Sequence, residues 1–164
     1  MTKTDKSEQP YWKNVPLAEM SKAQWEALCD HCGKCCLVKL EDEETGDIAF
    51  TDIICDMYDE AACGCANYAR RTELVPSCVQ LTPKNLGQLT FMPPSCAYRL
   101  LYEGRDLPDW HPLVSGDAVT VVEAGMSVQG RVRRESDMAD PFSPDAVEAR
   151  IVDWPLLEKK VEKK

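Results

Sequence analysis

The sequence lacks any long hydrophobic run. None of its 164 residues belongs to a stretch that approaches the roughly 20 apolar residues a helix needs to cross a bilayer. The first residues, MTKTDKSEQPYWKNVP, are polar and contain neither an apolar segment nor a small-residue cleavage site, so we expect no secretory signal. These absences predict a cytoplasmic protein with no membrane partner.

The chain also has little positive charge. It carries 19 Lys and Arg against 28 Asp and Glu, which gives a formal net charge of -9. A phosphate backbone repels such a chain unless the protein hides a basic patch. The EKKVEKK stretch at the C-terminus is too short and too mixed in sign to form one. We therefore expect no nucleic-acid partner.

No familiar catalytic motif or internal repeat occurs in the sequence. It has no G-x-x-x-x-G-K-[ST] phosphate loop, no nucleophile elbow and no H-E-x-x-H helix. Only two histidines are present. We expect His31 to face solvent or to lie beside a site without binding in it, and His111, which precedes a proline, to be structural. An enzyme is not favoured.

Cysteine, in contrast, is abundant. The chain has nine cysteines, and the run CDHCGKCC places four of them within eight residues, at positions 29, 32, 35 and 36. In a reducing cytoplasm, dense cysteine indicates metal binding or catalysis rather than a disulfide framework. The odd number would in any case leave one thiol unpaired.

The spacing of the run suits a metal. A C-x2-C turn brings two sulfurs to one side, as a tetrahedral ion requires, and Gly33 can adopt the positive φ that lets backbone amides approach the thiolates. C-x2-C-x2-C also begins the ferredoxin run of iron-sulfur proteins. Here Lys39 stands where the next cysteine of that run would be, and no proline follows. Zinc and iron both remain open.

Cys35 and Cys36 are adjacent in the sequence. Neighbouring side chains of an extended segment point in opposite directions, so we predict that these two thiols serve different metal ions. Two centres would then share one loop. Eight cysteines would complete two four-thiolate sites and leave one spare.

The remaining sequence predicts short elements in one α+β domain. Ser21 and Gln24 form a capping box for a helix that ends at Cys29, and residues 37–40 and 47–51 form a hairpin around an acidic turn, with Cys36 and Cys55 side by side at its ends. Further along, we expect a helical turn from Pro83, a helix from Ser95 to Gly104 with Cys96 as a thiolate at its N-terminus, a hairpin over residues 118–132, and a helix capped by Ser143.

The sequence also predicts the domain organisation. Residues 1–14 are predicted to be disordered, and residues 15–156 to form a single domain with a cysteine-rich half at 28–96. Residues 157–164 are predicted to be a charged tail.

Several segments carry a family resemblance. The run CDHCGKCC, Cys55, and the stretches CGCANYARRTELVPSC and PPSCAYRLLYEGRDLPDWHPLVSG resemble the YcgN-like proteins of the CxxCxxCC family, which is described as zinc- or iron-chelating, over roughly residues 12–116. In the broader family pattern a proline follows the arginine directly, whereas here Arg70 is followed by Arg71. Cys63 and Cys96 lie outside the shared pattern, and either could be an eighth ligand. The chelating residues that the resemblance implies are Cys29, Cys32, Cys35, Cys36, Cys55, Cys65 and Cys78.

Together these features predict a small, irregular, cysteine-rich α+β domain organised around one or two thiolate metal centres. Its function would be to bind zinc or iron, the latter as an ion or as an iron-sulfur cluster, with a protein partner left open. The alternative is a redox-active iron-sulfur or thiol-dependent enzyme, in which the cluster or the spare cysteine does chemistry.

Overall fold

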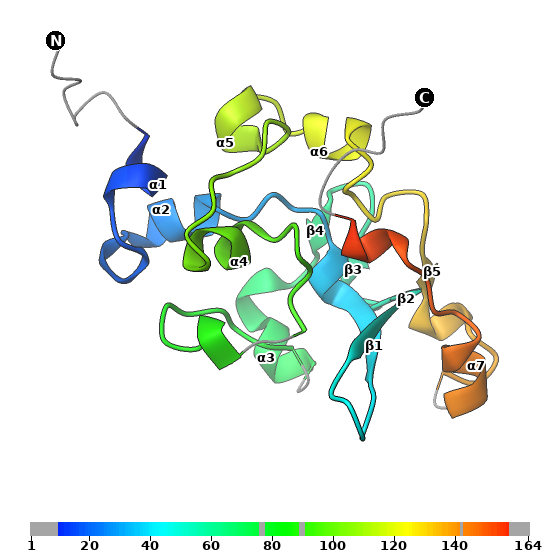
Figure 1. The fold of residues 1–164 in the computed structure, drawn as a ribbon. Helices are drawn as coiled ribbons and strands as arrows, with labels where there is room; N and C mark the ends of the chain where they lie inside the picture. The colour runs from blue at the N-terminus through cyan, green and yellow to red at the C-terminus, as the bar shows by residue number, and fades with distance from the viewer. Residues whose placement is uncertain (1–9, 76–77, 89–90, 142, 158–164) are drawn as a thin grey trace, which may run out of the picture.

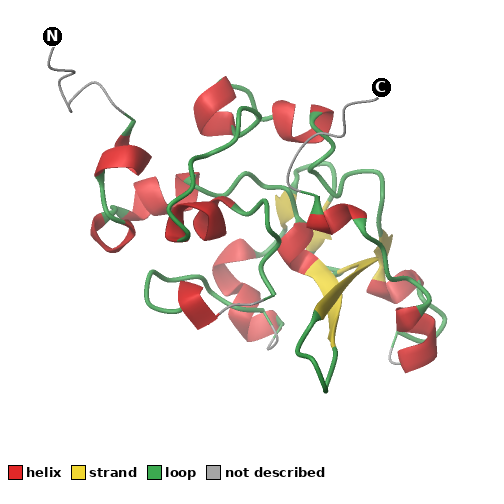
Figure 2. Cartoon of the chain, viewed as in Figure 1, coloured by secondary structure: helices red, strands yellow, loops and turns green. Residues whose placement is uncertain are grey.

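The computed structural model describes residues 10–75, 78–88, 91–141 and 143–157. Short helices and short strands alternate along the chain and are joined by long turns (Figures 1 and 2), so the α+β class is confirmed. Within the described ranges no helix is long and apolar enough to cross a membrane. The sequence analysis predicts disorder over residues 1–14 and a charged tail over residues 157–164. Residues 1–9 and 158–164 of these segments lie outside the described part. Residues 11–14, for which disorder is predicted, form a helical turn.

The elements are all brief. The α-helices are α1 (Tyr11–Asn14), α2 (Lys22–Ala27), α3 (Arg71–Leu74), α4 (Ala97–Tyr102), α5 (Pro112–Ser115), α6 (Thr120–Glu123) and α7 (Pro144–Glu148). The 3-10 turns are η2 (Leu17–Glu19), η3 (Lys34–Cys36), η4 (Tyr68–Arg70), η5 (Leu86–Gln88), η6 (Glu135–Asp137) and η7 (Trp154–Leu156). The strands are β1 (Leu37–Glu41), β2 (Ile48–Ile54), β3 (Tyr58–Asp59), β4 (Gly64–Cys65) and β5 (Arg133–Arg134).

Helix α2 begins with the predicted capping box. The Gln24 amide donates to the Ser21 hydroxyl at 3.1 Å, and the Gln24 side chain accepts from the Ser21 amide at 3.0 Å. The helix is tied to α4, because the Tyr98 hydroxyl donates to the Trp25 carbonyl at 2.7 Å and the two rings lie 4.7 Å apart. This contact fixes the point from which the cysteine run departs.

The predicted hairpin is also confirmed. Strands β1 and β2 pair antiparallel with Lys39 opposite Phe50, and β5 adds to β2 in parallel. Beyond the outer end of the hairpin, the Cys55 amide donates to the Cys36 carbonyl at 3.0 Å. The two cysteines are therefore neighbours, as predicted. A second, small sheet pairs β3 with β4.

Two predictions for the second half of the chain are wrong. Residues 118–132 contain helix α6 and a turn instead of a hairpin, because the valines that suggested a strand place Val121 in a buried position on one helical face. The N-cap position of α4 is Cys96 and not Ser95. The predicted turn at Pro83 precedes η5, and the predicted cap of α7 is confirmed, since the Ala146 amide donates to the Ser143 hydroxyl.

The apolar core is divided into three small clusters. The first contains Leu37, Phe50, Ile54, Tyr58 and Val128, the second Leu28, Leu86, Met92 and Tyr98, and the third Cys32, Val121, Ala124 and Met126. Residues 28–37, called the cysteine loop from here on, contribute one residue to each: Leu28, Cys32 and Leu37. The loop is thus the junction of the whole core.

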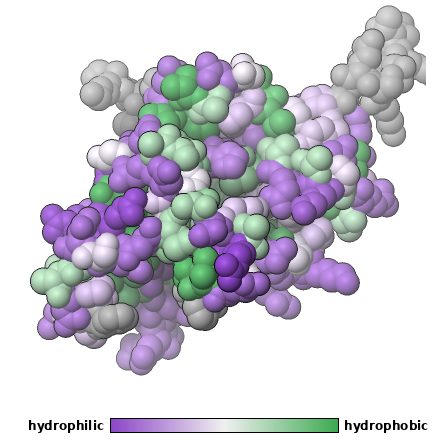
Figure 3. Space-filling model, turned by 180° about the vertical axis from the view of Figure 1, so that it is seen from behind, coloured by the Kyte–Doolittle hydropathy of each residue, from purple (hydrophilic) through white to green (hydrophobic). Residues whose placement is uncertain are grey.

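The surface shows no comparable organisation. On the face turned away in Figure 1, hydrophobic residues occur in separate groups among hydrophilic ones (Figure 3). The large apolar side chains that are exposed come from distant elements, among them Leu74, Tyr102 and Val114. Scattered exposure of this kind is normal for a folded domain.

Candidate metal centre

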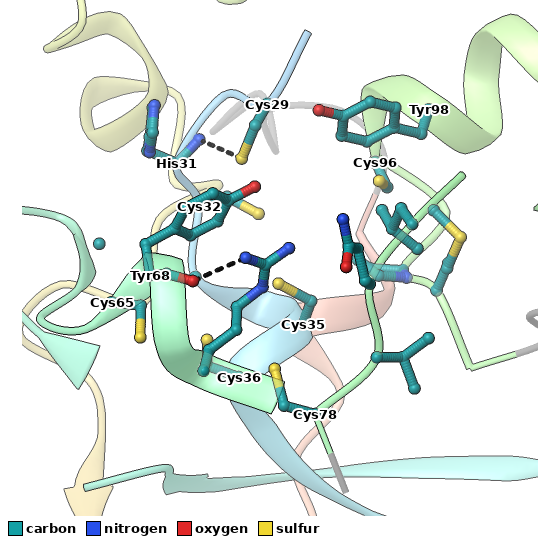
Figure 4. Close-up of a pocket in the computed structure, with 18 of the residues that line it drawn as sticks. Cys29, His31, Cys32, Cys35, Cys36, Cys65, Tyr68, Cys78, Cys96 and Tyr98 are labelled. Atoms are coloured by element: carbon teal, nitrogen blue, oxygen red, sulfur yellow. Dashed lines mark hydrogen bonds between the residues drawn. The ribbon is translucent and has the colours of Figure 1, made fainter. Parts of the chain in front are cut away.

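All nine cysteines line a single cleft. Its volume is about 1320 Å³, and its walls are the cysteine loop, the segment from Cys55 to Cys78 and the start of α4. Figure 4 shows most of these side chains around the cleft. All nine are free thiols. The structure therefore gathers every predicted ligand in one place, although the residues lie up to 67 positions apart in the sequence, from Cys29 to Cys96.

The thiols are gathered without being arranged as a coordination shell. Among the residues that the structure describes, no three cysteine, histidine, aspartate or glutamate side chains are close enough together to hold one ion. The donor set nevertheless fits the expected metals, since thiolates are preferred ligands of zinc and of iron-sulfur clusters. Metal binding would have to draw the cleft walls together.

Backbone amides already surround the first two thiols. Left-handed conformations at His31 (φ 60) and Gly33 (φ 80) curl the loop, and the His31 amide donates to the Cys29 sulfur at 3.4 Å. The Lys34 amide similarly donates to Cys32. Burial nonetheless raises the pKa of both the Cys29 and Cys32 thiols well above the usual value. Without metal these groups are neutral, so an ion must displace their protons.

Gly33 is needed for close packing as well as for its backbone conformation. A Cβ atom at this position would lie 2.6 Å from Val128 Cγ2 and 2.7 Å from the Tyr58 hydroxyl oxygen. The loop can approach the first core cluster only because this side chain is missing.

Replacing Gly33 by alanine is therefore expected to destabilise the protein strongly. The positive φ costs about 1–2 kcal/mol, and overpacking adds about 1–3 kcal/mol. Gly46→Ala is the matched control, because Gly46 has a similar φ of +75 and nothing within 4 Å of the added Cβ. Urea unfolding should show a clearly larger loss for Gly33→Ala. Equal losses would mean that only the backbone conformation matters.

The arrangement of Cys35 and Cys36 corrects a premise of the sequence analysis. The two residues lie in the 3-10 turn η3 and not in an extended segment. Adjacent side chains in such a turn are about 120° apart instead of opposed, and the Cys36 thiol donates to the Cys35 sulfur. That hydrogen bond lowers the pKa of Cys35 to about 7 and raises that of Cys36. The side chains therefore approach one another and do not diverge.

Cys55, Cys65 and Cys78 come from the segment that follows β2. Cys55 follows β2, and the Met57 amide donates to its sulfur. Cys65 lies in β4 opposite Tyr58 of β3, and the Ala66 amide donates to the Met57 carbonyl at 2.7 Å. Cys78 follows α3, and its electrostatic neighbours include the Arg71 guanidinium and other cysteine thiols.

Cys96 is at the N-terminus of α4, as predicted, but its expected thiolate character is wrong. The amides of Tyr98 and Arg99 donate to its sulfur and favour the thiolate. Burial outweighs them and raises the pKa of Cys96 to about 12. A helix of six residues does not offset the removal of this side chain from water.

Cys63 is arranged differently from the others. Its backbone is left-handed with φ 53, a conformation that is uncommon outside glycine and asparagine. The Cys63 thiol donates to the carbonyl of Glu60 at 3.5 Å, within its own turn.

Lys22, Lys39 and Arg71 line the cleft, and a further cation, Lys34, is buried within the cysteine loop. Lys34 is 0% exposed and donates to the Ser95 hydroxyl at 2.8 Å. Lys39 donates to the carbonyl of Cys35 at 2.9 Å. The Arg71 guanidinium lies 3.8 Å from the centroid of the Tyr68 ring. A lysine between two cysteines looks like a surface residue in the sequence, so no local signal reveals the burial of Lys34.

Neither histidine is in a position to act as a ligand in the structure. His31 is exposed, and Figure 4 shows its ring turned away from the Cys29 sulfur, toward which only its backbone amide points. His111 is fully buried, accepts from the Leu113 amide at 3.0 Å through Nδ1, and therefore donates through Nε2 to the Leu28 carbonyl at 2.8 Å. The structural role predicted for His111 is confirmed. It holds the residue from which the cysteine loop begins.

The cysteine cleft lies in a recognised type of domain. The family model "CxxCxxCC: Putative zinc- or iron-chelating domain" matches residues 28–97. This range begins at the first residue of the cysteine loop and includes every cysteine described above. The resemblance drawn from the cysteine spacing is confirmed.

Whole-chain comparisons define the family more narrowly. A UPF0260 protein of Parvibaculum lavamentivorans is 56% identical over 153 residues, which cover 92% of this chain and 96% of that protein. One from Rhodopseudomonas palustris strain HaA2 is 53% identical over 147 residues, with 90% and 85% covered, and one from Rhizobium etli is 49% identical over 150 residues, with 92% of each covered. No solved structure matches the chain. The chain belongs to the UPF0260 family.

Proposed function

We propose that this protein is a cytoplasmic metal-binding protein whose cysteine cleft holds zinc or iron, the iron as an ion or as an iron-sulfur cluster, in one or two thiolate centres. The observation that carries the proposal is the gathering of nine free thiols in one cleft at the junction of the three core clusters. Burial alone does not select such a gathering, since an isolated buried cysteine behaves as a small hydrophobic residue.

Hydrogen bonding to sulfur supports the same conclusion. The sulfurs of Cys29, Cys32, Cys55 and Cys96 each accept a backbone N–H from a residue two or three positions further on. Such bonds favour the thiolate, which is the form that binds metal. Neutral thiols are weak acceptors and gain little from them.

The buried lysine gives an independent argument from charge. A buried ammonium group is costly unless an anion compensates it. Within the described ranges no ion pair joins Lys34 to a carboxylate, and the groups that most favour its charge are first Cys32 and then Asp30. Four thiolates around a divalent ion carry a net charge of about -2 by formal count. An anionic metal centre would supply the missing compensation.

A redox-active iron-sulfur or thiol enzyme is the second candidate. The cleft is larger than two ions require, and side chains such as Leu17, Met20 and Phe91 make part of it apolar. An organic substrate or a partner side chain would fit such a space beside a metal centre. The described side chains offer no acid and base pair that would define a reaction.

Anaerobic purification followed by metal analysis separates the two candidates. We expect zinc or iron to copurify at one or more ions per chain, with ligation by sulfur visible in X-ray absorption. A colourless zinc protein supports a binding role, and a brown protein with acid-labile sulfide supports the redox role. If the reduced protein neither contains nor takes up either metal tightly, the proposed function is wrong.

A further inference from the structure

We propose that the cleft holds two separate four-thiolate centres that meet at the Cys35–Cys36 peptide bond, with Cys96 as the eighth ligand and Cys63 outside both. This inference rests on the proposed metal binding and adds the division of the ligands. The first centre consists of Cys29, Cys32, Cys35 and Cys96. The second consists of Cys36, Cys55, Cys65 and Cys78.

Packing places Cys29 and Cys96 together. Both side chains contact the second core cluster. The bond from the Tyr98 hydroxyl to the Trp25 carbonyl holds the start of α4 against the end of α2, so the two cysteines that follow α2 and precede α4 face the same part of the cleft. Figure 4 shows both on the side of the cleft where Tyr98 lies. Cys32 continues the C-x2-C turn that begins at Cys29.

The backbone places the second set together. Cys36 packs against the first core cluster, and the Cys55 amide donates to its carbonyl at 3.0 Å. The bond from Ala66 to Met57 and the pairing of β3 with β4 bring Cys65 to the same side. Cys78 has Cys35, Cys65 and Cys55 as its thiol neighbours. In Figure 4 the Cys78 side chain lies near both Cys35 and Cys36, away from Cys29.

Cys35 lies at the boundary between the two sets. Its thiol is a neighbour of Cys29, Cys32 and Cys96 and also of Cys78 in the second set, whereas the thiols that act on Cys36, apart from Cys35 itself, are Cys55 and Cys65. The second centre already has four ligands in Cys36, Cys55, Cys65 and Cys78. Cys35 is therefore the fourth ligand of the first centre. Because Cys35 and Cys36 are consecutive residues of η3, the two centres are direct neighbours.

Local geometry distinguishes Cys96 from Cys63. The Cys96 sulfur accepts two backbone amides, in the manner of Cys29 and Cys55. Cys63 is a donor to the carbonyl of Glu60 within its own turn. To turn its sulfur toward either centre, Cys63 would have to give up that bond at a residue whose backbone is already left-handed.

Lys34, Lys39 and Arg71 are distributed to match two anionic centres. Lys34 has Cys32 and Cys96 of the first centre among its electrostatic neighbours. Arg71 acts on Cys78 of the second. Lys39 lies at the boundary, since the thiols of Cys35 and Cys36 are the groups that most favour its charge.

Metal stoichiometry of single and double Cys→Ser variants tests the division. Reduced full-length protein loaded anaerobically with zinc should bind two ions, Cys96→Ser and Cys65→Ser one each, and Cys63→Ser two. The pair Cys29→Ser with Cys96→Ser should retain one ion, because both belong to one centre, whereas Cys65→Ser with Cys96→Ser should retain none. One ion in the wild type, or retention of two by Cys96→Ser, would overturn the division but leave metal binding intact. A wild type that binds no metal removes the proposed function itself.

The unaltered protein provides a test that does not depend on variants folding. Metal-loaded wild type treated with a thiol-alkylating reagent and mapped by mass spectrometry should be labelled rapidly at Cys63 alone. Demetallated protein should be labelled at all nine positions. Rapid labelling of Cys96 with protection of Cys63 would reverse the assignment, and protection of all nine would contradict a spare cysteine.

Discussion

Removal of the metal under reducing conditions is expected to unravel residues 28–78. Ordering this segment costs about 1–2 kcal/mol per residue, and its apolar contacts are divided among three small clusters. A structural thiolate site contributes about 10–16 kcal/mol at neutral pH, which offsets much of that cost. Hydrogen exchange should then show lost protection in β1 and β2, and protease should cut between Cys55 and Cys78.

The rest of the chain should respond later. Helices α5 and α6 are joined by a hydrogen bond of 2.8 Å between the hydroxyls of Ser115 and Thr120, so we expect their amides to be the last to lose protection. The control is the same chelator presaturated with zinc, followed by addition of zinc to the stripped protein, which should restore the pattern. Native protection throughout residues 28–78 in fully demetallated, reduced protein would make the metal incidental to the fold.

Local signals in the sequence were sufficient to predict several elements. The capping box at Ser21, the hairpin over β1 and β2, the neighbouring ends at Cys36 and Cys55 and the cap at Ser143 all depend on a few consecutive residues. The gathering of the distant Cys55, Cys65 and Cys78 beside the CDHCGKCC run was predictable because the family resemblance implied them as ligands. Cysteine chemistry therefore indicated a site before any fold was known.

The errors have a common physical origin in tertiary contacts. Alternating apolar residues over 118–132 suggested strands, but helix α6 buries Val121 and the following turn buries Met126. Ser95 looked like a helix cap, whereas in the fold its hydroxyl accepts from Lys34, which is 61 residues away. An extended backbone was assumed at Cys35, where a 3-10 turn forms instead. For α6 and for Ser95, a contact distant in the sequence decided between the local alternatives.

Lys34 is the residue whose importance only the fold reveals. Its ammonium group lies beneath the cysteine loop and reaches the Ser95 hydroxyl, the Leu157 carbonyl at 3.4 Å and the Met126 sulfur at 3.6 Å. All of these partners are neutral. Since Lys34 is 0% exposed, water does not screen its charge from the thiolates.

Replacing Lys34 by methionine is therefore expected to weaken metal binding about 10- to 100-fold, the usual effect of losing a partner that supports metal ligands. Methionine preserves the length and apolar body of the side chain, so the change removes mainly the charge. Affinity is measured by competition with a chromophoric chelator at low and at high salt. The loss should persist at high salt, because the interaction is buried.

Two control variants separate charge from packing. Ser95→Ala removes the nearest hydrogen-bond partner of Lys34 but keeps the ammonium group, and Lys84→Met removes a charge from an exposed turn outside the cleft. Both should bind metal nearly as tightly as the wild type, because each leaves the Lys34 ammonium group in place. If Lys34→Met bound as tightly as these controls, the buried lysine would have to be explained by its neutral partners alone. A loss confined to Lys34→Met would instead show that the fold places a fixed cation where the thiolate centre develops its negative charge.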